Sequence, residues 1–515
     1  MSTATIDALA PWNDGRYFAQ IQKAKPLPSP EECAGKPLQE VVKLVASRLL
    51  GDSYELKEVP ADLKSEPGFE VYDTLTAILP VLSEQSAWQW KRPARSLASM
   101  LESAKYPVRV QTSHLIFWWA RLGGLNGVPK LGHAKETRTM WVRDGSNTEL
   151  SWQIPANTDP NEAENRRVRF AIDPFHPETG LRLAGGGIID WLWGEGGMGL
   201  IDHEGTKEWK DKMEKWLFPN LPSSTTPVPG CHYAVALDLE PDGLIGLKQY
   251  YLPPRPRGAH ASYEDANGIQ VTMTNHQGDL EPLRPLLKEL NPALEAPFDV
   301  MRDYVNGPGE PSKLKFLVVA CDLVPDNKNR LKIYYFPLAQ HTFKDVLRDM
   351  TLDGKLNGPV IDEAMDKLRL FYKCLFPNNS DDDLLQPLDG GVGGLSYYYE
   401  LIPGHPLPCP KVYFDMSNYG ENDLQTTQAV EAFFAAVGKP NAQPGWYSES
   451  MQRAFSHRPL GKRAGIQTGV TFGLKPSGKW QITGYMSTEV FAEERGEGGP
   501  PQDELIKEFY DIYVG

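Results

Sequence analysis

Three short segments of the chain carry a lysine two positions before a tyrosine: Lys248 and Tyr250, Lys332 and Tyr334, and Lys411 and Tyr413. Residues two apart in a β-strand point to the same face, so each pair would present a cation beside an aromatic ring, with Arg330 on the face of Lys332. Lysine and arginine bind diphosphate oxygens, and the π-face of tyrosine attracts a cation. The pattern predicts a site where basic residues hold the leaving group of an allylic diphosphate and tyrosines shield the carbocation.

The same pairs would also fit the solvated exterior of a sheet. Their recurrence at the same place in successive segments favours a shared inner face instead. Burying several cations together is costly unless an anion neutralises them, which agrees with an anionic ligand.

A candidate acid–base residue lies on another segment. In TELSWQI, Glu149 and Ser151 share one face, and in RRVRFAIDP, Arg167 and Arg169 share one face. A carboxylate on the inner face could accept the proton that an aromatic ring loses when it is alkylated. The alternative is that Glu149 only forms an ion pair with a neighbouring arginine.

These residues lie on five predicted β-hairpins, in which β-rich runs flank turns of Pro, Gly, Asp and Asn. The paired runs are Glu149–Ile154 with Val168–Ile172, His232–Leu239 with Gly246–Leu252, Lys315–Leu323 with Arg330–Phe336, Leu395–Ile402 with Lys411–Asp415, and Ile466–Leu474 with Trp480–Met486. Because the hairpins recur every 71 to 83 residues, the chain reads as one supersecondary unit repeated about five times.

Helical segments separate the hairpins, at about 206–218, 279–305, 341–376 and 426–455, and a last helix is expected at 503–513. Antiparallel hairpins with helices on one side predict a sheet closed into a barrel, with the helices outside. We expect residues 1–80 to form a partly helical extension, with helices near 38–50 and 70–83, and residues 81–515 to form the barrel domain.

Composition narrows the class of protein. The 515 residues are 41% hydrophobic and include 13 Trp and 21 Tyr, which excludes a disordered chain. The net charge of −14 argues against a nucleic-acid or anionic-membrane partner and places the acidic excess on solvated helices and loops. With five scattered cysteines, no signal peptide and no apolar run approaching the roughly 18 residues of a membrane span, we expect a soluble cytoplasmic protein.

Several motifs are set aside. Gly194–Gly199 satisfies G-x-G-x-x-G, but the next helix starts only near Thr206, so the dinucleotide-binding geometry is missing. The run Asp381–Asp383 lies in a polar loop and lacks the further carboxylate of an aspartate-rich magnesium motif. The ten histidines show no zinc-ligand spacing, and His232 on a predicted strand is interpreted as structural.

Taken in order, the quoted segments resemble the fungal-type aromatic (indole) prenyltransferases of the dimethylallyltryptophan synthase family. The resemblance runs from about Trp88 to the last strands, through WQW with MLESAKYPVRVQ, TELSW with VRFAIDP, ALDL with LKQYYLP, CDL with RLKIYYF, and KVYFD. It implies an α+β fold of αββα repeats (the ABBA barrel), in which ten antiparallel strands are ringed by helices.

The resemblance also implies an activity and a site. A prenyl group would pass from an allylic diphosphate, dimethylallyl diphosphate first, to a small aromatic acceptor in secondary metabolism, with no metal or other cofactor. Glu149 resembles the acidic residue that contacts the acceptor N–H and assists proton removal. By motif, the other site residues are Arg169, Lys248, Arg330, Lys332 and Lys411 for the diphosphate, Tyr250, Tyr334 and Tyr413 for the cation shield, and Met140 and Trp141 for the acceptor.

The chain departs from the family pattern at three places. Ala234 stands where tryptophan-C4 members carry a lysine, which weakens a tryptophan-C4 assignment. Gly469-Val470-Thr471-Phe472 lacks a tyrosine that relatives often carry, so a larger pocket and a longer donor such as geranyl diphosphate become a hypothesis. Lys411 stands where some members have glutamine, which would tighten anion binding.

The sequence leaves alternatives open. The acceptor is an indole derivative or, alternatively, a phenolic polyketide or tyrosine. From another class, a barrel that only binds an amphiphilic anion would carry the same residues without chemistry. The oligomeric state, a homodimer included, is not determined.

Overall fold

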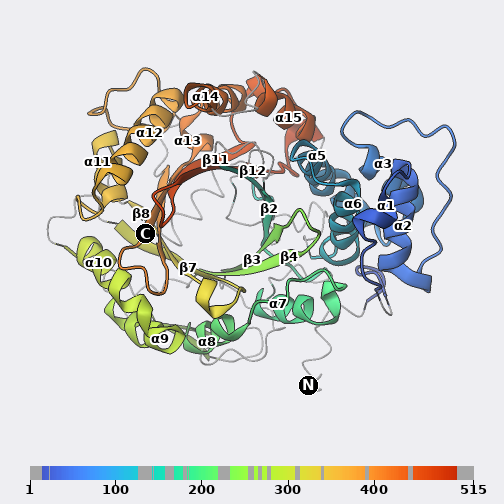
Figure 1. Ribbon diagram of the computed structural model, residues 1–515, viewed down its shortest axis with the longest axis horizontal. Helices are drawn as coiled ribbons and strands as arrows, with labels where there is room; N and C mark the ends of the chain where they lie inside the picture. Colours follow the sequence, from blue (N-terminus) through green and yellow to red (C-terminus); the bar gives the residue numbers. More distant parts are fainter. Residues whose placement is uncertain are drawn as a thin grey trace.

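Ten antiparallel strands close into one barrel, and helices surround it (Figure 1). The computed structural model describes residues 14–21, 24–125, 142, 144–156, 167–177, 183, 185–217, 232–252, 260–264, 270–274, 280–307, 314–337, 341–388, 394–438 and 445–495. Around the barrel the strands follow the order β1, β12, β11, β10, β9, β8, β7, β4, β3, β2. Their bounds are β1 Thr148–Pro155, β2 Arg167–Ile172, β3 His232–Leu239, β4 Ile245–Leu252, β7 Leu314–Asp322, β8 Leu331–Pro337, β9 Leu395–Leu401, β10 Cys409–Phe414, β11 Gln467–Leu474 and β12 Trp480–Ser487.

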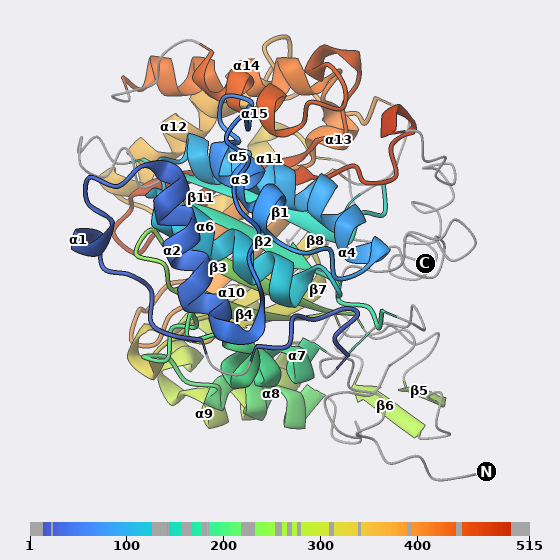
Figure 2. The same ribbon diagram turned by 90° about the vertical axis from the view of Figure 1, so that its right-hand side faces the viewer.

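The predicted fold class and its five hairpins are therefore confirmed, with strand ends that differ by no more than two residues. Arg330 lies just before β8 rather than inside it. One hairpin was not predicted: β5 (His260–Glu264) pairs with β6 (Gln270–Thr274) as a separate two-stranded sheet. Figure 2 shows this hairpin set off from the barrel strands.

Helices cover the barrel on all sides in Figure 1. The expected helical segments are found, and the closing helix expected at 503–513 lies outside the described residues. The helices around the strands are α4 Glu84–Gln89, α5 Arg95–Ser103, α6 Val108–Phe117, α7 Gly185–Trp193, α8 Glu208–Leu217, α9 Arg284–Leu290, α10 Glu295–Val305, α11 Phe343–Thr351, α12 Pro359–Leu375, α13 Met416–Tyr419, α14 Asp423–Ala436 and α15 Trp446–Ala454.

The core lies between the outer faces of the strands and the helices. On β2, Val168, Phe170 and Ile172 alternate with less buried residues and face this layer. Phe170 meets the ring of Trp118, which directly follows α6, at 4.9 Å between centroids. Period-two alternation thus divides each strand between an apolar outer face and an inner face left for polar side chains.

The N-terminal helices form a further layer on one side. In Figure 1, α1 (Pro30–Cys33), α2 (Leu38–Leu50) and α3 (Glu70–Ile78) lie outside α5 and α6. Val42 and Leu49 of α2 belong to the same continuous cluster of buried residues as the barrel helices. The domain boundary near residue 80 remains a prediction.

Among the described helices, none combines the length and the hydropathy of a membrane-spanning segment.

The two faces of one strand should respond differently to truncation. Trp152 on the outer face of β1 is fully buried against Trp446 and Tyr447 of α15. We expect Trp152→Ala to lower the free energy of unfolding by about 3–5 kcal/mol, measured by chemical denaturation. The adjacent inner-face change Ser151→Ala is the control and should cost less than about 1 kcal/mol. Equal losses would contradict the assignment of faces.

Candidate active site

Some side chains on the inner face of the barrel keep part of their surface exposed, whereas their neighbours on the outer face are buried against the helices. On β10, Tyr413 is partly exposed while Val412 and Phe414 are fully buried. On β8, Tyr334 is partly exposed beside the fully buried Tyr335. At the level of these tyrosines the inner face is therefore covered less tightly than the outer face.

Asp238 of β3 holds two of the predicted cations in place. Lys248 Nζ lies 2.6 Å and 2.7 Å from the two carboxylate oxygens, and Arg169 Nε lies 3.0 Å from Oδ1. Burial alone would raise the pKa of Asp238, but Arg169 and Lys248 outweigh it and hold that pKa well below its usual range. The carboxylate therefore stays ionised and orients both cations.

Asp322 at the end of β7 does the same for the next pair. Lys332 Nζ donates to Oδ1 at 2.6 Å and Arg330 Nε donates to Oδ2 at 2.7 Å. Arg330 Nη1 also donates to Glu400 Oε1 of β9 at 3.1 Å. Burial opposes ionisation of Asp322, yet Lys332 and Arg330 lower its pKa far more. Four predicted cations are thus preorganised by carboxylates that the sequence interpretation had not assigned.

Two further lysines have no carboxylate partner within ion-pair distance among the described residues. Lys411 Nζ donates to the hydroxyls of Tyr485 (3.1 Å) and Thr483 (3.4 Å), and Gly473 on the neighbouring strand leaves room for its stem. Burial, then the cations Arg169 and Lys475, lower the pKa of Lys411 well below its usual value. Burial also lowers the pKa of Lys475, just past β11, to about 8, against the opposing charge of Glu400.

The result is a surplus of positive charge. Three carboxylates face six cations on this part of the inner face: Asp238, Asp322 and Glu400 against Arg169, Lys248, Arg330, Lys332, Lys411 and Lys475. With every cation protonated, the excess equals three charges, which suits a diphosphate ester with three negative charges.

Five tyrosines form a continuous layer next to the cations. Neighbouring ring centroids lie 5.2 to 6.2 Å apart through the series Tyr250, Tyr334, Tyr398, Tyr413 and Tyr485. Lys411 Nζ lies 5.1 Å from the ring centroid of Tyr413, within the distance at which a ring face attracts a cation. The structure brings the three predicted tyrosines together and adds Tyr398 and Tyr485.

The layers have a fixed order along the barrel. Strands β2, β4, β8, β10 and β12 alternate around the closed antiparallel sheet and so run in one direction. On β4, β8 and β10 the lysine comes two residues before the tyrosine. On β12, Ser487 comes two residues after Tyr485 and pairs with Glu149 of β1. The order is therefore cations, then tyrosines, then Glu149.

Glu149 is a half-buried carboxyl group on the inner face of β1. Its Oε1 accepts a hydrogen bond of 2.9 Å from the hydroxyl of Thr468. Burial raises the pKa of Glu149 to about 8, Thr468 opposes the rise, and the negative charge of Asp415 adds to it. Glu149 has no ion-pair partner among the described residues, so the alternative that it only neutralises an arginine is not what the structure shows.

The structure places the remaining residues discussed from the sequence as follows. Met140 and Trp141 lie outside the described residues. Ala234 pairs with Tyr250 and Gly469 pairs with Tyr485, so both small residues lie on the inner face at the level of the tyrosines. His232 begins β3, and its side chain is not described.

One sequence signal could have found the aspartates. Asp238 precedes Lys248 by ten residues, and Asp322 precedes Lys332 by the same ten. Each pair brackets one hairpin turn, so the spacing brings carboxylate and ammonium to neighbouring strands. Lys475 lies in a turn, where strand alternation gives no signal.

The motifs set aside have structural roles. A Cβ at Gly196 would collide with Trp191, and one at Gly197 with the backbone of Leu192, so these glycines allow close packing. Asp381 pairs with Arg369 and Lys373. Within the described ranges, no group of three or more His, Cys, Asp or Glu residues is placed to hold a metal ion.

Comparison with known proteins gives consistent results. Residues 84–449 match the family model described as tryptophan dimethylallyltransferase. The chain is 26% identical over 463 residues to a prenyltransferase of Pestalotiopsis microspora, covering 82% of this chain and 92% of that protein. It is 24% identical to 4-O-dimethylallyl-L-tyrosine synthase of Claviceps purpurea, covering 78% of this chain and 87% of that one.

The fold also matches solved structures. NotF in complex with brevianamide F and DMSPP superposes with a TM-score of 0.59 at 17% identity, covering 79% of this chain and 95% of NotF. At this identity the match concerns the fold, and it agrees with the closed barrel described above.

The raised pKa of Glu149 predicts a pH-dependent stability. The folded pKa is about 8 against an ordinary value of 4.5, so the folded state keeps a proton that the unfolded state has lost between these values. Stability from Glu149 is present below the lower value and is lost as the pH rises through the upper one. We expect Glu149→Gln to melt at a higher temperature than the unsubstituted protein near pH 9, with a smaller difference near pH 5. A difference that grows toward acid would contradict this.

The unpaired lysines predict proton uptake on binding. An anion beside Lys411 and Lys475 should raise both pKa values, so protons should be taken up at pH 8 when an unreactive allylic diphosphate analogue binds. Calorimetry in buffers of different ionisation enthalpy measures this uptake. Lys411→Met should reduce it, and binding without uptake would contradict the assignment of both lysines to the anion site.

Proposed function

The chain belongs to the tryptophan dimethylallyltransferase family of aromatic prenyltransferases, and we propose that it transfers a dimethylallyl group from dimethylallyl diphosphate to an indole ring without a metal ion, as a step of secondary metabolism. The observation that supports this most directly is the order of cations, tyrosines and Glu149 along the barrel. Each layer suits one part of the reaction: the leaving group, the carbocation and the acceptor.

The cations would act first, on the donor. Arg330 and Lys332 are held at fixed positions by Asp322, so they need little reorganisation to bind diphosphate oxygens. As the C–O bond of the donor breaks, negative charge accumulates on the departing diphosphate, and the surplus of positive charge stabilises it. This surplus supplies the neutralisation that other enzymes obtain from a metal ion, which is why we propose a metal-independent reaction.

The tyrosines would act on the allylic cation. Burial raises the pKa of Tyr250, Tyr334 and Tyr413, so these phenols stay neutral and offer their π-faces. Together they also keep water from the cation, which would otherwise be trapped as an alcohol.

Glu149 would act on the acceptor. The ring attacks the allylic carbon and a C–C bond forms, after the electrons of the broken C–O bond have left with the diphosphate. The arenium ion then passes the proton of the attacked carbon to the Glu149 carboxylate, which restores aromaticity. A carboxylate on the far side of the tyrosine layer can accept a hydrogen bond from the N–H of the aromatic substrate. Its negative charge then stabilises the positive charge that spreads over the ring. Since the pKa of Glu149 is about 8 in the empty barrel, the N–H and the nearby cation would favour its ionised form during turnover.

The acceptor and the donor length each have a second candidate. The likeness to 4-O-dimethylallyl-L-tyrosine synthase favours a phenol such as tyrosine as the alternative acceptor. The small residues Ala234 and Gly469 beside the tyrosine layer favour a longer donor, such as geranyl diphosphate, as the alternative to dimethylallyl diphosphate.

The experiment is an incubation of the protein with either donor, excess EDTA and a panel of indoles and phenols. Diphosphate release and product mass report turnover. We expect a dimethylallyl-indole product whose yield EDTA does not reduce. Products only from phenols would replace the acceptor, and turnover lost in EDTA but restored by Mg²⁺ would overturn the metal-independent reaction.

Two substitutions should have different kinetic effects, one on donor binding by the cations and one on catalysis by Glu149. Lys332→Gln should raise the KM for the donor about ten-fold or more, because it removes a charged contact to the diphosphate. Glu149→Gln should leave donor affinity unchanged and lower kcat about a hundred-fold, because it removes the base. The exposed Lys328→Gln in the same β7–β8 connection is the matched control for the first variant. Full activity of Glu149→Gln with an indole would rule out the base role.

A further inference from the structure

Strand β11 contains one extra residue beside Glu149. Gln467 pairs with Met486 and Gly469 pairs with Tyr485, so three residues of β11 lie opposite two consecutive residues of β12. This is a β-bulge, and Thr468 is the residue in its middle. Bulges bend a strand locally and redirect a side chain. Here the redirected group is the hydroxyl of Thr468, which donates to Glu149 Oε1 at 2.9 Å.

The bulge is fixed from outside the barrel by Asp423, the first residue of α14. The N–H of Gln467 donates to Asp423 Oδ1 at 2.7 Å, and the N–H of Ile466 donates to Oδ2 at 3.2 Å. The side chain of Gln467 points to the helices and donates to the hydroxyl of Tyr447 at 3.0 Å. With Gln467 held outward on this side, the next residue is turned toward the interior.

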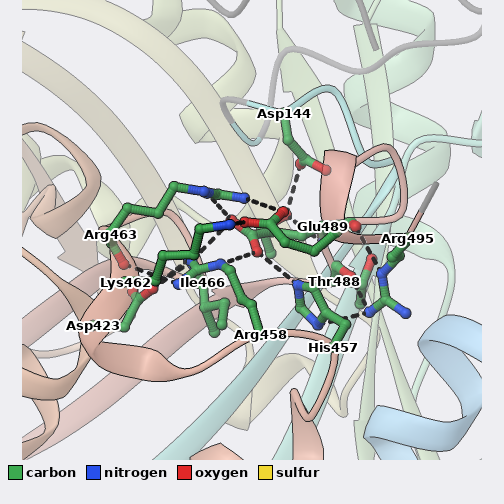
Figure 3. A network of polar contacts seen from close by, with 12 residues as sticks. Asp144, Asp423, His457, Arg458, Lys462, Arg463, Ile466, Thr488, Glu489 and Arg495 are labelled. Atoms are coloured by element: carbon green, nitrogen blue, oxygen red, sulfur yellow. Dashed lines mark hydrogen bonds and ion pairs between the residues drawn. The ribbon is translucent and has the colours of Figure 1, made fainter. Parts of the chain in front are cut away.

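Asp423 belongs to a buried ion-pair network at the same end of the barrel (Figure 3). Arg458 Nη2 donates to Asp423 Oδ2 at 2.6 Å, and its Nε donates to Glu489 Oε2 at 2.7 Å. Glu489 also accepts from Arg463 and contacts His457, and these partners help to lower its pKa to about 2 against the effect of burial. Arg458, Asp423 and Glu489 are essentially inaccessible to solvent.

The backbone at Glu489 is strained. Its φ of 42° lies in the left-handed region, which a residue with a side chain seldom adopts. Such strain persists only where surrounding contacts determine the conformation, and it concentrates at functional sites. Glu489 lies two residues beyond Ser487, the partner of Glu149 across the sheet. The network therefore contacts the backbone of β11 and of the segment just past β12, at the end of these strands where Glu149 lies.

We propose that Thr468 is a positioning residue for the reaction: held by the bulge and by Asp423, its hydroxyl fixes one carboxyl oxygen of Glu149 and leaves the other to the aromatic acceptor. Within the described part of the chain, Glu149 Oε2 has no hydrogen-bond partner, as this role requires. The inference rests on the proposed base function of Glu149. It adds the residue that orients this base and sets its protonation.

The groups around Glu149 shift its pKa in opposite directions, and the Thr468 hydroxyl is the one that lowers it. The titratable groups that face Glu149 are Asp415, just past β10, and Tyr485 on β12. Burial and Asp415 favour the neutral carboxylic acid, whereas the Thr468 hydroxyl donates to the carboxylate and favours it. Loss of the hydroxyl should therefore raise the pKa of Glu149 above its present value of about 8.

The test compares Thr468→Val, which keeps the shape and removes the hydroxyl, with Thr468→Ser, which keeps the hydroxyl. The pKa of Glu149 is measured by carboxyl ¹³C NMR on protein labelled at glutamate, with the signal assigned by its absence in Glu149→Gln. We expect Thr468→Val to raise that pKa by about one unit and Thr468→Ser to change it little. Melting temperatures of both variants check that the fold is kept.

The same variants are then assayed for turnover against pH. In Thr468→Val the alkaline rise of kcat should move by the same amount, with about ten-fold lower kcat at neutral pH and an unchanged KM for the donor. Thr468→Ser should restore the profile. An unchanged pKa of Glu149 in Thr468→Val would overturn the inference. If the unsubstituted protein transfers no prenyl group, the proposed function fails while the NMR result still decides the role of Thr468.

Discussion

The positive charge enclosed by the barrel is the constraint on which the rest of the structure depends. Six cations within one barrel would repel one another. Asp238, Asp322 and Glu400 pair with four of them and balance three of the six positive charges. The remaining excess is relieved in the empty barrel by lowered lysine pKa values. The proposed diphosphate donor would complete the charge balance when it binds.

This constraint explains why the two faces of each strand carry different kinds of residue. The outer faces must pack tightly against the helix layer, because the described inner face carries mainly polar and tyrosine side chains and few apolar ones. Trp152, Phe170 and Phe414 meet aromatic residues of the surrounding helical layer, and all three are nearly inaccessible. The inner face can carry polar residues because the packing of the strands against the helices stabilises the fold. The ion-pair network around Arg458 extends this rigidity to the end where Glu149 lies.

Much of this was predictable from the sequence, because alternation and turn chemistry are local properties. The hairpins, the barrel and the inward lysine–tyrosine pairs follow from a period of two, and Lys248 with Tyr250 needs no tertiary information. The carboxylate partners of the cations could be assigned only once the neighbouring strands were known. The repeated ten-residue spacing, as from Asp238 to Lys248, indicates part of this pairing. The hydrogen bond from Thr468 to Glu149 joins residues 319 apart and depends on a bulge, so no local pattern indicates it.

The repeated hairpin has a consequence for selectivity. The cations and tyrosines come from strands on several sides of the barrel. They therefore define where a ligand would lie along the barrel axis, but they constrain its rotation about that axis only weakly. Glu149 and Thr468 occur on one sector only, at β1 and β11. That single sector breaks the symmetry of the repeat. Under the proposed function, this sector would set the rotational orientation of a flat acceptor, and with it the ring carbon that faces the allylic cation. Regiochemistry would then depend on the place where the first and the last hairpins of the barrel meet.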